Sequence, residues 1–319
     1  MRLEIVIVNY RTPELTVDCL RSVEAEIQER GDTHVVVVDG DSGDDSVEII
    51  GTALKENDWD SWVSFLPLEV NGGFAYGNNA AIGPALERAE PPDFVLLLNP
   101  DTIARPEALT HLMDFMDAHP RAGIAGSRLE DRDGTVRYSA FRFASPWSEL
   151  EGMARLGVVS RLLRPHLVNP PIQDSDHRTD WVAGASMIIR REVFAAIGML
   201  DPEYFLYYEE ADFCLRAVRA GWECWYVPAS RVIHLVGQSS GVTGAGRTQK
   251  RTPPYWFASR RRYFRKNHGL VQALAADAGW LMGYALWSVR RCLTRRQRID
   301  PPCLGRDFIH WTYFPPRAS

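Results

Sequence analysis

Acidic side chains that could hold a metal ion or move a proton stand at the ends of apolar runs in this chain. Asp101 follows the apolar run Phe94–Leu98, separated from it by Asn99 and Pro100. Because Pro100 has no N–H for a strand ladder, the run predicts a buried strand that ends before it. The carboxyl ends of such strands are where open α/β sheets bind ligands. Asp101 is therefore either a turn residue or a hard oxygen ligand for Mg²⁺ or Mn²⁺.

A second group of carboxylates opens a predicted helix over residues 209–220. Glu209, Glu210 and Asp212 crowd its first turn, where each acid interacts favourably with the helix dipole by roughly 0.3–1 kcal/mol. The aromatic run at residues 204–208 would also shield these carboxylates from water and raise their pKa values toward that of a useful base. The segment is therefore either a dipole-compensated helix start or an acid–base site.

Three other features place polar or flexible residues beside predicted strands. His234 ends a short apolar segment and is either a metal ligand or a partly buried structural histidine. Asp39 ends the apolar run His34–Val38 and opens a polar turn. The glycine-rich segment Asn71–Asn79 permits the backbone to approach a ligand closely, and it leads into a helix. These features are candidates for ligand contacts.

The elements that must position these residues alternate between strands and helices. Apolar runs and amphipathic segments predict strands at Leu3–Val8, His34–Val38, Val63–Leu68, Phe94–Leu98 and Ala122–Ser127, and helices at 13–30, 46–57, 79–87 and 106–118. This alternation predicts an α/β fold with a mostly parallel, twisted sheet flanked by helices. No GxGxxG fingerprint follows the first strand, which disfavours a hydride-transferring dehydrogenase.

The second half of the chain is less regular. Residues 145–176 contain several prolines and predict a loop-rich insertion over the site. Further predicted elements are a strand at 181–189, a short helix at 191–197 and strand segments at 223–227 and 232–234. Within the first of these, Gly184 and Ala185 leave room for a ligand.

The totals exclude several classes of protein. The chain has 319 residues and a net charge of −5, which argues against a nucleic-acid binder. Its five cysteines show no CxxC spacing, so neither zinc nor a disulfide framework is expected, and a reducing cytoplasm fits. Met1–Ile5 is expected to enter a first strand and not to be a signal peptide. No uncharged apolar stretch reaches about 18 residues, so we expect no transmembrane helix.

Together these residues resemble the family 2 glycosyltransferases with a GT-A (Rossmann-like) fold, particularly the rhamnosyltransferase-like members that build bacterial surface glycans. The resemblance covers Leu3–Gly269. Val8-Asn9-Tyr10 is similar to the first-strand motif of the family, and Val38-Asp39 followed by Ser42 is similar to its nucleobase-binding turn, with Gly40 in place of the usual Asn.

The remaining motifs follow the same pattern. Asn71-x-Gly73-Phe74-Ala75-x-Gly77-Asn78-Asn79 is the most specific match, and Asn99-Pro100-Asp101 resembles the metal-binding DxD motif with Asn as its first residue. Residues 209–216 (EEADFCLR) resemble the catalytic segment, in which Glu210 takes the position of the base. His234 falls where many members place a further metal or diphosphate ligand, and residues 260–269 resemble the basic segment that follows the catalytic one.

The resemblance implies an inverting displacement by an acceptor hydroxyl on a nucleotide-activated sugar. Glu210 would be the general base, with Asp212 as the alternative and Glu209 beside them. Mg²⁺ or Mn²⁺ on Asp101 and His234 would stabilise the departing nucleoside diphosphate. The expected nucleotide-sugar contacts are Asn9, Tyr10, Asp39, Asp41, Asn71, Gly73, Phe74, Asn78, Asn79 and Asn99.

The expected donor is a dTDP-, UDP- or GDP-linked sugar, with rhamnose on dTDP by analogy to the family. The expected acceptor is a glycan or a lipid-linked glycan. Two alternatives stay open: a sugar-1-phosphate nucleotidyltransferase, and a non-catalytic nucleotide-sugar or glycan binding protein. The first would need a glycine-rich basic loop after the first strand, where residues 9–13 stand instead.

The expected organisation is a catalytic domain over residues 1–246, with a donor part at 1–130 and an acceptor part at 131–246, and a basic helical tail at 247–319. Within the tail, Leu270–Val289 is largely apolar and basic residues flank it. Residues 260–298 therefore predict either a helix at an anionic membrane surface, on the inner face of the plasma membrane, or a helix packed on the catalytic domain or on a second subunit of a homodimer.

Overall fold

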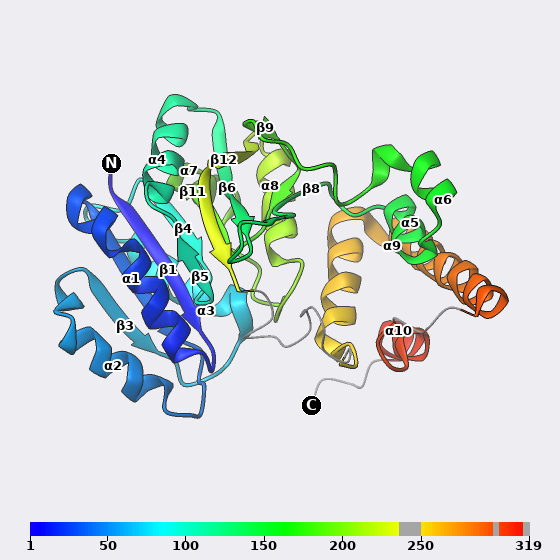
Figure 1. Cartoon of the computed structure of the whole chain (residues 1–319), viewed down its shortest axis with the longest axis horizontal. Coiled ribbons are helices and arrows are strands. Elements are labelled where there is room, and N and C mark those ends of the chain that lie inside the picture. The colour runs from blue at the N-terminus through cyan, green and yellow to red at the C-terminus, as the bar shows by residue number, and fades with distance from the viewer. Residues whose placement is uncertain (236–249, 296–299, 315–319) are drawn as a thin grey trace. The chain divides into compact units, whose positions relative to one another are not determined.

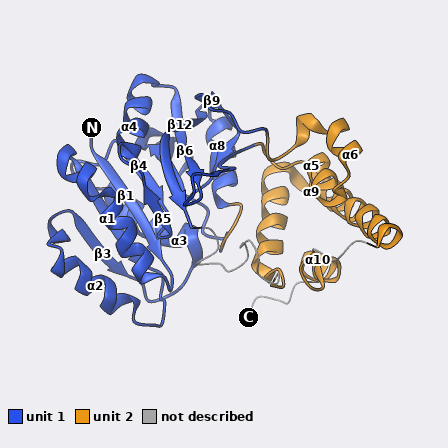
Figure 2. Cartoon of the chain, viewed as in Figure 1, with its two compact units in different colours: residues 1–141, 171–205, 209–240 blue, residues 142–170, 206–208, 241–319 orange. Residues whose placement is uncertain are grey.

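The computed structural model describes residues 1–235, 250–295 and 300–314, which fall into two compact units (Figure 2). Unit 1 comprises residues 1–141, 171–205 and 209–240, and unit 2 comprises residues 142–170, 206–208 and 241–319. The expected end of the catalytic domain, after residue 246, lies outside the described residues and stays a prediction. Residues 296–298 of the basic tail lie outside them as well.

Unit 1 is built on a mixed sheet. The strands of the unit are β1 (Leu3–Asn9), β2 (Thr33–Asp39), β3 (Val63–Pro67), β4 (Phe94–Leu98), β5 (Thr102–Ala104), β6 (Ala122–Glu130), β7 (Val136–Arg137), β8 (Ala140–Phe141), β9 (His177–Arg178), β10 (Trp181–Val182), β11 (Ser186–Arg190) and β12 (Glu223–His234). The main sheet has the order β3-β2-β1-β4-β11-β6-β12-β5, with β7 beside β6 and β9 beside β12 (Figure 1). β8 and β10 form a separate pair.

The strand directions divide the main sheet into two halves. β3, β2, β1 and β4 are parallel neighbours, and β6 is parallel to β12. β11 lies between the halves and runs antiparallel to both β4 and β6. The predicted α/β sheet is confirmed, and its parallel strands bring their carboxyl ends to one edge.

Helices cover both faces of this sheet. The helices of unit 1 are α1 (Pro13–Arg30), α2 (Ser46–Glu56), the 3₁₀ helix η1 (Trp59–Ser61), α3 (Gly73–Leu86), α4 (Ala108–Ala118), α7 (Arg191–Ile197) and α8 (Glu209–Arg219). The core between the sheet and α1, α2 and α4 holds apolar side chains from all four. On the other face, Gly77 of α3 lies so close to Val8 that an added Cβ would stand 2.8 Å from Val8 Cγ1.

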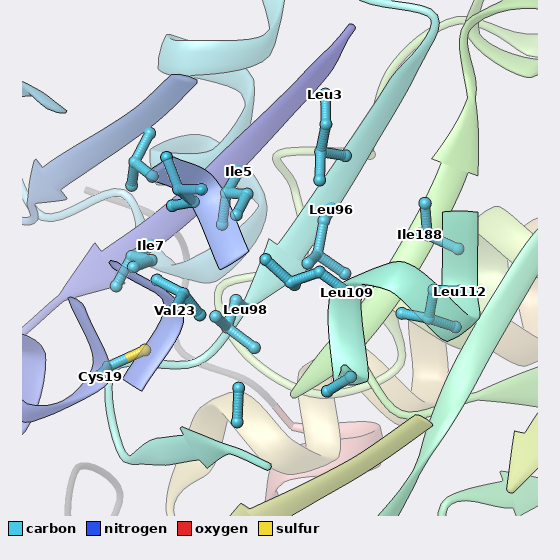
Figure 3. Close-up of a cluster of buried hydrophobic side chains, with 14 of the residues drawn as sticks. Leu3, Ile5, Ile7, Cys19, Val23, Leu96, Leu98, Leu109, Leu112 and Ile188 are labelled. Carbon is cyan, nitrogen blue, oxygen red and sulfur yellow. The ribbon is translucent and has the colours of Figure 1, made fainter. Parts of the chain in front are cut away.

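The central core shows why the apolar runs form strands here. Leu3, Ile5 and Ile7 alternate along β1 and pack with Leu96 and Leu98 of β4 beneath α1 and α4 (Figure 3). None of the five is more than 2% exposed. Burying each of them contributes about 1.5–3 kcal/mol, which favours the sheet over any exposed arrangement of these runs.

Several predicted segments differ from the structure. The helix expected at 79–87 begins at Gly73, and the strand segments expected at 223–227 and 232–234 form the single strand β12. The strand expected at 181–189 is divided into β10 and β11, because residues 183–185 bend out of the ladder. Residues 102–104 form the short strand β5, and the helix expected from residue 106 begins at Ala108. The insertion at residues 145–176 was expected to be loop-rich, but much of it is helical.

The elements of unit 2 are mostly helical. They are α5 (Pro146–Ala154), α6 (Gly157–Leu162), the 3₁₀ helix η2 (Arg164–His166), α9 (Pro254–Thr294) and α10 (Leu304–Tyr313). α9 is interrupted at Gly269, whose φ of 77° and ψ of 174° are not helical. At Gly279 and Gly283 an added Cβ would stand 2.5 Å from backbone oxygens of α5, so these glycines allow the two helices to approach closely.

A buried ion cluster joins α5, α9 and α10. Arg260 is 1% exposed and donates to Glu149 Oε2 (2.9 Å) and to Asp277 Oδ1 (2.6 Å). The Tyr313 hydroxyl donates to Asp277 Oδ2 (3.0 Å). Burial raises the pKa of Glu149, and the positive charge of Arg260 opposes that rise. Each carboxylate is thus satisfied inside the unit. Across the described ranges, no helix combines the length and the apolar character needed to cross a membrane.

Candidate active site

A polar network joins the ends of β1 and β2. Asn9 and Asp39 are partners at the last position of their strands, and both are buried. Asn9 Nδ2 donates to Asp39 Oδ1 (2.7 Å), and the Ser42 hydroxyl donates to the same oxygen (2.7 Å). Ser42 N donates to Asp39 Oδ2 (3.1 Å), and the Thr16 hydroxyl donates to Asn9 Oδ1 (3.0 Å). The network holds the turn at residues 39–42 in one conformation.

The glycine-rich segment packs against the backbone of Phe205. Gly73 has a φ of 86°, and an added Cβ would stand 1.9 Å from the carbonyl oxygen of Phe205. Phe74 N donates to that same oxygen (2.9 Å), and Gly73 N donates to Asn71 Oδ1 (3.0 Å). Only glycine fits this position, because any side chain would collide with the Phe205 backbone.

The two asparagines of α3 differ in what they bind. Asn79 Nδ2 donates to the Leu200 carbonyl (2.8 Å), and Leu200 N donates to Asn79 Oδ1 (3.2 Å), so Asn79 anchors the chain beyond α7. Asn78 is 1% exposed, and its Nδ2 donates to the Phe74 carbonyl (2.8 Å). Its Oδ1 has no hydrogen-bond partner in the part of the chain that the structure describes. Of the two side chains, Asn78 keeps an unused acceptor.

Asp101 and His234 meet at the edge of the sheet. Asp101 Oδ1 lies 3.3 Å from His234 Nε2, and Asn99 Nδ2 lies 3.4 Å from the same nitrogen. β12 carries His234 to this point because it pairs with β5, with His234 opposite Thr102. The Asp101 side chain is 5% exposed and the His234 side chain is 17% exposed. A carboxylate and an imidazole thus converge where the sequence predicted two metal ligands.

Asp212 of α8 is held by its own neighbours. It is fully buried, and its Oδ2 accepts from Arg216 Nε (2.9 Å) while its Oδ1 accepts from the Tyr204 hydroxyl (3.2 Å). Arg216 also donates to the Ile197 and Met199 carbonyls (2.7 and 2.9 Å). Asp212 therefore links α8 to the segment that follows α7. Sequence analysis missed Arg216, although its spacing of four residues from Asp212 on a helix is a signal for such a pair.

Glu210 lies in a different environment, beside Gly184 and Phe74. A Cβ added to Gly184 would stand 3.0 Å from Glu210 Cγ and 3.2 Å from Phe74 Cε1. Burial raises the pKa of Glu210, and hydrogen bonds with the backbone of Glu210 and Gly184 oppose that rise. The carboxylate that the family resemblance marks as the base thus has a raised pKa.

Short contacts connect the acid group of α8 to the edge of the sheet. Glu210 touches Gly184, and the carbonyl of the next residue, Ala185, accepts from Asn99 N (3.0 Å). Asn99 in turn lies beside His234. Other predicted contacts are more peripheral: the Tyr10 ring lies 5.1 Å from the guanidinium carbon of Arg11, and Asp41 is exposed. Glu209 is buried at the start of α8.

The family of the chain follows from a match over most of its length. The model of the family described as "Glycosyltransferase like family 2" matches residues 2–269. The chain therefore belongs to this family, and the protein is a glycosyltransferase. The resemblance inferred from the sequence motifs is confirmed.

Three relatives carry rhamnosyltransferase names. The N-acetylglucosaminyl-diphospho-decaprenol L-rhamnosyltransferase of Mycobacterium tuberculosis is 28% identical over 254 residues, covering 74% of this chain and 75% of that protein. Rhamnosyltransferase WbbL of Escherichia coli is 30% identical over 166 residues, covering 51% and 60%. The dTDP-rhamnosyl transferase RfbF of Shigella flexneri is 25% identical over 235 residues, covering 74% and 69%.

Solved structures of glycosyltransferases share the fold. A mannosyltransferase from Pyrobaculum calidifontis, solved in complex with GDP-Man and Mn²⁺, superposes with a TM-score of 0.57 at 13% identity, covering 98% of this chain and 83% of that one. At this identity the likeness concerns the fold alone. It agrees with the GT-A fold that the sequence motifs predicted.

The contact between Gly73 and Phe205 predicts a large effect of a small substitution. Gly73→Ala should lower the free energy of unfolding by more than the roughly 1–2 kcal/mol of a left-handed alanine, because the added methyl also collides with Phe205. Gly51→Ala is the matched control: Gly51 lies in α2 with open space around its Cα, so alanine should raise the free energy of unfolding by about 0.5–1 kcal/mol. Urea unfolding measures both. Equal changes in the free energy of unfolding for the two variants would contradict the collision between the added methyl group and Phe205.

Proposed function

We propose that this glycosyltransferase inverts the anomeric centre of a nucleoside-diphosphate sugar as it transfers the sugar to a hydroxyl group of a glycan or lipid-linked acceptor, in the synthesis of a bacterial surface polysaccharide. The observation that carries the proposal is the position of Glu210. Its half-buried side chain is linked through Gly184 and Ala185 to Asn99, and so to the Asp101–His234 pair.

The general base assigned by the proposal is Glu210. A base must be ionised at the working pH and still attract a proton, and a raised pKa improves the second property. Burial supplies that rise for Glu210. Asp212 is less suited because Arg216 and Tyr204 already donate to its oxygens, and it serves instead to position α8.

The proposed metal ligands are Asp101 and His234. A neutral imidazole nitrogen either donates or accepts, so Nε2 cannot satisfy both Asp101 Oδ1 and Asn99 Nδ2 at once. A divalent cation would accept lone pairs from Nε2 and Oδ1 together, and Mn²⁺ tolerates this mixed set of ligands better than Mg²⁺. Among the described residues no third His, Cys, Asp or Glu joins them. A bound ion would stabilise the charge that develops on the leaving diphosphate.

The proposed donor contacts fall into two groups, one at the turn after β2 and one at the start of α3. Asp39 and Ser42 of the turn are buried and joined by hydrogen bonds, which suits the turn to position a nucleobase beside Asn9 and Asp39. The unused Oδ1 of Asn78 and the glycine backbone at residues 72–73 suit the sugar diphosphate. The names of the relatives favour dTDP-rhamnose as the donor and a polyprenyl diphosphate glycan as the acceptor.

The role of Glu210 is tested by transfer from dTDP-rhamnose to a polyprenyl diphosphate N-acetylglucosamine acceptor. Glu210→Gln should lower kcat by roughly 10²–10⁴-fold while leaving dTDP binding unchanged, because the base acts only on the acceptor proton. Glu192→Gln, an exposed acid in the first turn of α7, is the control and should keep full activity. NMR of the product reports the anomeric configuration. An active Glu210→Gln enzyme, or retention of configuration, would contradict the proposal.

The raised pKa of Glu210 also predicts how stability depends on pH. In the unfolded chain the carboxyl should titrate near its ordinary value of about 4.3. Because the folded state raises this pKa, ionisation of Glu210 costs stability as the pH rises from the unfolded pKa through the folded one. Relative to the wild type, Glu210→Gln should therefore gain stability as the pH rises above the unfolded-state pKa of about 4.3. Urea unfolding at a series of pH values measures this gain. A difference independent of pH would show that the carboxyl is not perturbed.

A further inference from the structure

The second part of α9, beyond Gly269, presents an uncovered apolar face. Its large members are Val271, Leu274, Met282, Leu286, Val289 and Leu293, spaced by three, four or eight residues so that they share one side of the helix. Val271 is 80% exposed and Leu293 is 79% exposed. From residue 270 to residue 293, every exposed residue has an uncharged side chain. We call these six residues the apolar face.

The opposite side of the same helix is already occupied. Ala273, Ala276, Trp280 and Trp287 are buried there, and Trp280 stacks on Phe308 of α10 with ring centroids 3.8 Å apart. An ordinary surface helix would turn charged residues outward opposite such a stripe. This helix is apolar on both sides, so its outer side is suited to a partner and not to water.

In the sequence, basic residues flank the apolar face at both of its ends. Arg262, Arg265 and Lys266 precede it, and Arg290 and Arg291 follow within its last turns. Asp277 is the only acid between residues 250 and 295, and it is buried against Arg260. Its charge is therefore not available to offset the basic residues at the surface.

Other acids of unit 2 are engaged in the same way. Glu149 pairs with Arg260, Asp300 with Arg155, and Asp307 with Arg251. The described surface of unit 2 therefore carries an excess of positive charge beside an apolar stripe. This combination of features is typical of helices that lie in the interface of an anionic bilayer.

Charge also decides between a bilayer and a second copy of the chain. If two apolar faces paired in parallel, each basic end would meet itself, and if they paired antiparallel, one basic end would meet the other. Like charges would oppose each other in both arrangements. An anionic lipid surface attracts both ends at once. We propose that α9 binds the surface of an anionic membrane through its apolar face, with the basic ends among the lipid headgroups.

This proposal goes beyond the assigned sugar transfer and does not depend on it. Membrane binding would bring the enzyme to the surface that displays a lipid-linked acceptor, but the binding itself needs neither donor nor acceptor. Failure of the transfer assay and failure of membrane binding are therefore separate results.

Vesicle flotation of the full chain tests the proposal. The protein should float with vesicles of phosphatidylcholine that contain one third phosphatidylglycerol, and should float weakly with phosphatidylcholine alone. Val271→Glu combined with Val289→Glu should lower binding to the anionic vesicles at least about tenfold, because both side chains are exposed and each substitution adds a charge that the lipid repels. High salt should weaken binding of the wild type.

The matched control is Val47→Glu combined with Val70→Glu, two exposed valines of unit 1. It should float like the wild type. The proposal is overturned if the wild type fails to float with anionic vesicles, or if the α9 variant floats as well as the control. Light scattering tests whether a second copy of the chain occupies the apolar face instead of a membrane. A wild-type dimer that the α9 substitutions dissociate would assign the apolar face to a second copy and also overturn the proposal.

Discussion

The antiparallel strand β11 is the constraint on which the arrangement of this enzyme depends. It pairs with β4 on one side and with β6 on the other, so it joins the parallel half formed by β3, β2, β1 and β4 to the half that carries β12. Its register places Ser186 opposite Leu98, and the bend before it presents the Ala185 carbonyl to Asn99 and leaves Gly184 against Glu210. The segment before this strand thus connects the proposed base to Asn99, which lies beside the proposed metal ligand His234.

Local patterns predicted the elements that carry a continuous apolar run of their own. β1, β2 and β4 were visible as apolar runs because they are buried on both faces. β5 could not be predicted, because three residues carry little pattern and its partner is the distant end of β12. The helix α5 was missed for a similar reason. It packs against Gly279 and Gly283 of α9, more than a hundred residues away, and prolines near it indicated a loop.

The same limit applies to the site. The motifs predicted that Asp101 and His234 belong together, and the pairing of β5 with β12 brings them within 3.3 Å. The sequence did not distinguish between Glu210 and Asp212, since both stand in the first turn of one helix. Asp212 is fully buried and Glu210 is half-buried, and the two carboxylates also differ in their partners. Arg216 pairs with Asp212, whereas burial is the largest influence on the pKa of Glu210 and raises it.

The most direct test of the account is nucleotide binding measured by thermal stabilisation, with dTDP in the presence and absence of Mn²⁺. At about a hundred times its dissociation constant the nucleotide should stabilise the wild type by roughly 2.7 kcal/mol, and only when Mn²⁺ is present. Asp101→Ala should lose this effect, and Asp114→Ala, an exposed acid of α4, should keep it. The account is contradicted if dTDP stabilises both variants without Mn²⁺. It is also contradicted if none of dTDP, UDP and GDP stabilises the wild type.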